Sequence, residues 1–76
     1  MKPVGIPLGE LAITVLYHDE LEVLHLCDGL GLTQAEAGEQ MGVSRGTVQR
    51  ILADARQKVA TALVEQHAVA IRHISS

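Results

Sequence analysis

Residues 33–52 (TQAEAGEQMGVSRGTVQRIL) constrain the fold of this 76-residue chain more than any other segment. Thr33 is a good N-cap, and Glu36 stands three residues later, where it completes a capping box. Gly42 supplies the left-handed residue that ends a helix, and Ser44 is suited to cap the next one. Two short helices joined by a glycine turn predict a helix-turn-helix core. An αα-hairpin with no role in DNA binding is the alternative.

The second predicted helix has an apolar face and a polar face. At about 100° per residue, six apolar residues fall on one stripe: Val48, Ile51, Leu52, Ala55, Val59 and Ala62. Polar or small residues occupy the opposite side: Gly46, Gln49, Arg50, Ala53 and Gln57. In a helix-turn-helix, the N-terminal residues of the second helix reach base edges in the major groove. The polar side is therefore the side that we expect to face DNA.

Arg45 and Gln49 are the candidates for reading bases, because Arg pairs bidentately with guanine and Gln with adenine. Ser44, Thr47 and Arg50 are better placed for phosphates, which fix the position of a protein on DNA without reading sequence. A solvated helix face is the alternative interpretation of any single member.

Two further positions favour a close approach of this helix to DNA. Gly46 and Ala53 have almost no side chain, so the helix backbone can come near the groove. The complete predicted DNA-binding set is Thr33, Ser44, Arg45, Gly46, Thr47, Gln49, Arg50 and Ala53.

The charge of the chain is unevenly distributed. The net charge of −3 argues against strong non-specific DNA binding. Before residue 40, however, seven acids stand against one base, which gives −6, whereas from residue 40 onward five bases stand against two acids, which gives +3. The basic half coincides with the predicted recognition helix, and an asymmetry of this kind can orient a protein on DNA.

The length predicts a single domain over residues 1–76. With one Tyr and no Phe or Trp, its core has to be aliphatic. The single Cys27 excludes an internal disulfide and fits a reducing cytoplasm. There is no signal peptide and no apolar run long enough to cross a membrane, so we expect a cytoplasmic protein without a membrane partner.

The flanking segments predict further elements. Residues 1–10 are rich in Pro and Gly and indicate an extended segment. Residues 11–17 fit a strand or part of a helix, and the β-branched run favours a strand. Asp19 is the expected N-cap of a helix that ends near Gly29, and the helix after the turn is expected to end near Gln66. Residues 68–74 fit a strand that pairs with residues 13–17.

A chain this short and nearly without aromatics would leave apolar surface wet, so we expect a homodimer formed through the chain ends. A strand that folds back on its own helices is the alternative. The four His residues form no metal pattern, and nothing suggests an activating base beside Cys27. No pair of acids suggests acid–base catalysis. We therefore expect neither an enzyme nor a cofactor.

Nearly the whole chain resembles a small prokaryotic family of uncharacterised, predicted DNA-binding proteins whose helix-turn-helix is similar to the promoter-reading domain of sigma-seventy-type factors. The most specific pieces are Asp19-Glu20-Leu21-Glu22, Gly42-Val43-Ser44-Arg45, and Ile51-Leu52 with Ala55-Arg56 and Lys58-Val59-Ala60. The resemblance implies a module that acts in transcription control. The chain departs from the family at Cys27 and Gly46, and it lacks a basic extension ahead of Lys2, which would remove phosphate contacts.

These observations together predict a mainly α domain, with two short strands from the chain ends, that binds specific sequences of double-stranded DNA. The first alternative is a protein-interaction module of the same fold that docks on RNA polymerase or on a partner regulator. The acidic net charge favours that alternative, and the cluster from Ser44 to Arg50 opposes it. A metal- or redox-sensing switch that uses Cys27 has little support.

Overall fold

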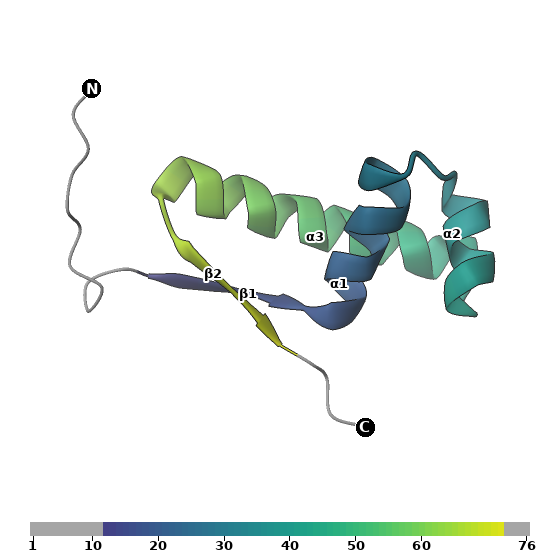
Figure 1. Ribbon diagram of the computed structural model, residues 1–76, viewed down its shortest axis with the longest axis horizontal. Helices are drawn as coiled ribbons and strands as arrows, with labels where there is room; N and C mark the ends of the chain where they lie inside the picture. The colour runs from purple at the N-terminus through teal and green to yellow at the C-terminus, as the bar shows by residue number, and fades with distance from the viewer. Residues whose placement is uncertain (1–11, 73–76) are drawn as a thin grey trace.

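The computed structural model describes residues 12–72. Its elements, in chain order, are β1 (Ile13–Tyr17), α1 (His18–Val23), the π-helix η2 (Leu24–Gly29), α2 (Gln34–Met41), α3 (Arg45–Glu65) and β2 (Ala68–Arg72). The fold is mainly helical with one small sheet, as predicted. In Figure 1 the long helix α3 runs the length of the fold, with α2 at its N-terminal end and the two strands beside its C-terminal half. The predicted extended segment 1–10 lies outside the described residues.

The predicted pairing of the two strands is confirmed, and the strands are parallel. Ile13 pairs with Ala68 and Tyr17 with Arg72. A parallel pair needs a long crossover connection, which the helices between the strands provide. A hydrogen bond of 2.8 Å between Thr14 Oγ1 and His67 Nδ1 ties the two strand starts together. Residues 73 and 74, which the sequence also assigns to the second strand, lie outside the described residues.

The prediction that Asp19 caps the first helix is wrong. Strand β1 continues directly into α1, so the helix begins at His18 and the extended residue Tyr17 precedes it. The residue that satisfies the helix start is Glu20, whose Oε1 accepts from the Tyr17 N–H at 2.9 Å. Asp19 instead accepts from the N–H of Glu20 at 2.9 Å. Glu20 is only 6% exposed, and its Oε1 also accepts from Lys58 Nζ at 2.8 Å. This pair joins α1 to the middle of α3.

The helical run that starts with α1 ends at Gly29, as predicted, but its last part is a π-helix. The Leu30 N–H donates to the carbonyl oxygen of His25, five residues earlier, at 2.8 Å. This wider turn is the form in which the first helical run reaches the loop before α2.

The core is aliphatic, as predicted. Its buried residues are Val23, Leu26, Ala37, Val48 and Leu52. The apolar stripe predicted on α3 is confirmed: Val48, Leu52, Ala55 and Ala62 are buried, and Ile51 and Val59 are half-buried. Tyr17 lies outside this core and is 41% exposed, with Lys58 Nζ 4.6 Å from its ring centroid. The helices α1, η2, α2 and the first half of α3 therefore share one small core that fixes the start of α3.

Candidate nucleic-acid interface

The start of α2 is fixed by the predicted capping box. The Thr33 N–H donates to Glu36 Oε1 at 2.8 Å, and the Glu36 N–H donates to Thr33 Oγ1 at 3.1 Å. The side chain of each residue thereby accepts from the backbone N–H of the other. These two N–H groups would otherwise be left unpaired at the helix start. Thr33 is exposed at this corner of the molecule.

The turn between α2 and α3 holds the two helices close together. Gly42 ends α2 in the left-handed conformation, with φ 73°, as predicted. The Val43 N–H then donates to the carbonyl oxygen of Gly38 at 2.9 Å. A Cβ on Gly38 would lie 2.7 Å from the carbonyl oxygen of Val43, closer than a real Cβ is found. The chain passes over α2 at this point only because Gly38 has no side chain.

Ser44 caps α3, as predicted. Its Oγ accepts from the Thr47 N–H at 3.1 Å and lies 2.9 Å from Thr47 Oγ1. The Ser44 hydroxyl therefore caps the first turn of α3 and also hydrogen-bonds the Thr47 hydroxyl. Thr47 is half-buried and Ser44 exposed.

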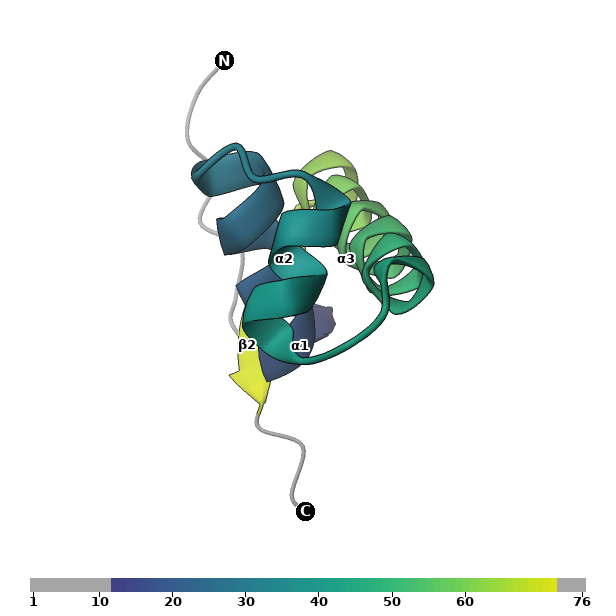
Figure 2. The same ribbon diagram turned by 90° about the vertical axis from the view of Figure 1, so that its right-hand side faces the viewer.

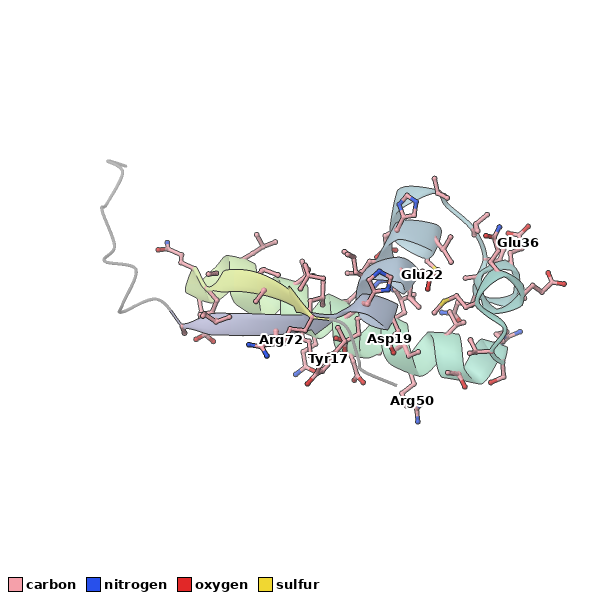
Figure 3. All side chains as sticks on the ribbon, turned by 60° about the horizontal axis from the view of Figure 1, so that its bottom comes forward. Tyr17, Asp19, Glu22, Glu36, Arg50 and Arg72 are labelled. Carbon is pink, nitrogen blue, oxygen red and sulfur yellow. The ribbon has the colours of Figure 1, made fainter. Side chains whose placement is uncertain are left out.

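The polar side of the α3 start faces away from the core. The exposed residues there are Arg45, Gly46, Gln49, Arg50 and Ala53. Figure 3 shows Arg50 extending outward from α3. Within residues 12–72, neither arginine forms a hydrogen bond or ion pair through its side chain. Both guanidinium groups are thus available to an anionic partner.

Two other bases on α3 are occupied. Arg56 forms a two-point ion pair with Asp28, with Nε at 3.1 Å from Oδ2 and Nη2 at 2.6 Å from Oδ1. These hydrogen bonds hold the pKa of the Asp28 carboxyl below its ordinary value and raise that of Arg56. Lys58 is held by the buried Glu20. Two of the positive charges in the second half of the chain are therefore already paired with acids of the same chain.

A shallow depression of about 210 Å³ joins the starts of α2 and α3, and it is lined by Thr33, Gln34, Ala35 and Arg45. In Figure 2, α2 lies beside the near end of α3, in keeping with two helix starts that line one depression. The structure thus brings Thr33 together with Arg45, one of the residues predicted on α3. Sequence reasoning missed Gln34 and Ala35, because only the crossing of the two helices brings them beside Arg45.

The sequence family described as "Protein of unknown function DUF134" matches residues 1–73 of the chain. The chain belongs to this family. A relative from Dehalococcoides mccartyi, "UPF0251 protein DET0218", is 53% identical over 70 residues, which is 92% of this chain and 60% of the relative. "UPF0251 protein Rru_A1194" from Rhodospirillum rubrum is 50% identical over 92% of this chain and 49% of the relative. A "UPF0251 protein" from Methanocella arvoryzae is 51% identical, with 92% and 42% covered.

The family resemblance predicted from the sequence is thereby confirmed at the level of membership, across diverse prokaryotes. The chain spans about half the length of the curated relatives it matches. No solved structure matches the chain.

Within residues 12–72, no three or more His, Cys, Asp or Glu side chains are grouped so that they could hold a metal ion. None of the helices in that range combines the length and apolarity needed to span a bilayer. Cys27 is a free, half-buried thiol.

Proposed function

We propose that this chain binds specific sequences of double-stranded DNA in transcription control, with α2, the Gly42 turn and α3 acting as a helix-turn-helix. The observation that carries the proposal is the exposed start of α3, where Arg45, Gln49 and Arg50 project from a well-capped helix. Side chains fixed on a rigid helix and left without internal partners suit recognition of an external polar surface.

In this proposal Arg45 and Gln49 read bases. They are four residues apart and therefore neighbours on one helix face. Arg pairs bidentately with guanine and Gln with adenine in the major groove. Gly46 and Ala53 have little or no side chain, so nothing bulky projects from that face at these two positions. A Cβ on Gly46 would meet nothing nearer than Ser44 Oγ at 4.0 Å. The backbone of α3 can therefore approach the bases closely.

Phosphate contacts come from the edges of the same surface. Arg50 supplies a positive charge beside the groove-facing residues. The depression between Thr33 and Arg45 joins a hydroxyl and a cation beside the start of α2. Contacts from both helices would fix the orientation of α3 on the DNA.

Titration of fluorescently labelled duplexes, followed by anisotropy, tests the proposal. The variant Arg45→Ala/Arg50→Ala removes the two unpaired cations of α3, and we expect binding to fall at least tenfold. The matched controls are Arg56→Gln and Arg72→Ala. Each removes one exposed positive charge outside the proposed surface. We expect each to weaken binding less than Arg45→Ala alone or Arg50→Ala alone. An equal loss of binding free energy for each charge removed, in all variants, would show that net charge, and not this surface, governs binding.

A protein-interaction module that docks on RNA polymerase or on a partner regulator is the second candidate. The pairing of Arg56 with Asp28 and of Lys58 with Glu20 favours it, because only part of the basic half is available to phosphates. Failure of the parent chain to bind any duplex at low salt, together with direct binding to purified RNA polymerase, would favour this candidate.

A further inference from the structure

The sheet is incomplete as it stands. It has two parallel strands of five residues each. Parallel sheets are ordinarily covered on both faces, and a two-stranded sheet alone is only marginally stable. In β2, Val69 is 50% exposed and Ile71 48% exposed, and both lie on the face of the sheet that carries the buried Leu16 of β1. The exposed apolar residues of β1, Ile13 and Tyr17, stand at the two ends of that strand and on the opposite face. The apolar face that begins at Leu16 is therefore left exposed on β2.

We propose that a second copy of this chain completes the sheet, with the two β2 strands pairing antiparallel about a two-fold axis at Ala70. Ala70 is the central residue of Ala68–Arg72. This arrangement places Val69 of each copy opposite Ile71 of the other. The result is a four-stranded sheet in the order β1, β2, β2, β1.

The pattern of β2 is complementary to itself in this arrangement. The two exposed apolar residues flank Ala70 symmetrically, so both fall opposite an apolar residue. Paired residues of neighbouring strands share one face of a sheet, and Ile71 pairs with Leu16 within each chain. The apolar pairs of the two copies therefore extend the face that carries Leu16. Arg72 falls opposite Ala68, so the two copies bring no like charges directly together.

The end of α3 supplies the additional surface that a dimer needs. A standard interface buries roughly 800 Å² per partner, which is about a seventh of the 5543 Å² surface of this chain. One short strand edge covers less than that. Leu63 and Val64, in the last turn of α3, are 75% and 81% exposed and stand just before β2 in the chain. Their burial would enlarge the apolar contact.

The dimer does not depend on DNA binding, but one consequence rests on the proposed function. The 21 residues of α3 separate the DNA-reading end from the end next to β2, a distance of about 30 Å at 1.5 Å per residue. Two reading ends held at this distance from a two-fold axis fit inverted half-sites about one or two DNA turns apart, because one turn spans about 34 Å.

Site-directed disulfides test the proposed axis. In a Cys27→Ala background, Ala70→Cys would place the two thiols directly opposite each other, within the distance that a disulfide spans. Val69→Cys is the matched control, because its two copies would be offset by two residues and their Cα atoms would lie about 8 Å apart, beyond disulfide reach. With oxidised glutathione we expect a covalent dimer from Ala70→Cys and little from Val69→Cys. Equal cross-linking of both variants would overturn the proposed pairing.

Sedimentation equilibrium then tests the dimer itself. We expect the parent chain and Leu30→Lys to be dimers at tens of micromolar, and Val69→Lys to be a monomer with an unchanged helical spectrum. Both substituted residues are exposed in the single chain, so neither should prevent folding. A monomeric parent chain, or a dimeric Val69→Lys, would contradict the proposal. A dimer that binds no duplex would leave this proposal intact and contradict the proposed function.

Discussion

Gly38 lies directly under the carbonyl oxygen of Val43, where an added Cβ would come within 2.7 Å of that oxygen. Backbone, and not a flexible side chain, occupies the space. The relative placement of α2 and α3 therefore depends on this glycine. We expect Gly38→Ala to lower the free energy of unfolding by about 2 kcal/mol, the usual range for overpacking, as measured by urea denaturation. A variant as stable as the parent would show that the two helices can move apart at little cost.

Gly46→Ala should have the opposite effect on stability. The position is exposed, helical and open, so alanine restricts the unfolded chain without a clash. We expect a gain of about 0.5 kcal/mol, or roughly 2–4 °C in melting temperature. The added methyl group faces the proposed groove contact, and we expect DNA binding to weaken about tenfold, which is about 1.4 kcal/mol. A stabilised variant with unchanged DNA affinity would exclude close approach at this point.

Arg45 and Gln49 should affect sequence preference, whereas Arg50 should affect affinity alone. We expect Arg45→Ala and Gln49→Ala each to weaken binding to a selected site by roughly 1–3 kcal/mol and to relax the preference at one or two base pairs. Arg50→Ala should weaken selected and unrelated duplexes equally, because phosphates carry no sequence information. Anisotropy titrations against single-base variants of the site measure both effects. Loss of base preference in Arg50→Ala would reverse these assignments.

The Asp28–Arg56 ion pair should give stability that depends on pH. Its hydrogen bonds lower the pKa of Asp28 in the folded chain, so the folded state favours the charged carboxylate. The resulting stability is present above the unfolded pKa of about 3.9 and is lost as the pH falls through the lower folded pKa. We expect Asp28→Asn to be less stable than the parent at pH 7 and the difference to shrink below about pH 4.

Urea denaturation at pH 7, 5 and 3 measures this difference. The control is the same substitution in an Arg56→Gln background, where the pair is already absent and no pH-dependent difference should remain. A difference that is as large at pH 3 as at pH 7, or that survives in the control background, would assign the effect to something other than the ion pair.

The features that could be predicted from sequence are those whose partners are close in the chain. Thr33 and Glu36 are three residues apart, as are Ser44 and Thr47, and each pair is joined by the capping bonds that its spacing predicts. Gly42 likewise ends its helix through its own backbone conformation. Local spacing therefore located the capped start of α3 and the turn before it, but not Gln34 and Ala35, which lie beside Arg45.

The features that sequence missed depend on residues far apart. Asp19 is a good local cap, but β1 runs straight into α1, and Glu20 is held by Lys58, 38 residues away. Arg56 binds Asp28, which is 28 residues away in the chain. The sequence alone therefore could not show that the charge of Arg56 is paired within the fold. The parallel direction of the strands depends on how the helices that lie between them in the sequence pack together, and no local pattern encodes that packing.

Selection from a random pool of duplexes with the purified chain tests the central claim most directly. We expect enrichment of a short motif, with a guanine and an adenine among its preferred bases, and loss of that enrichment in Arg45→Ala/Gln49→Ala. A folded parent chain that leaves the pool unchanged after repeated rounds would contradict the claim that α3 reads DNA.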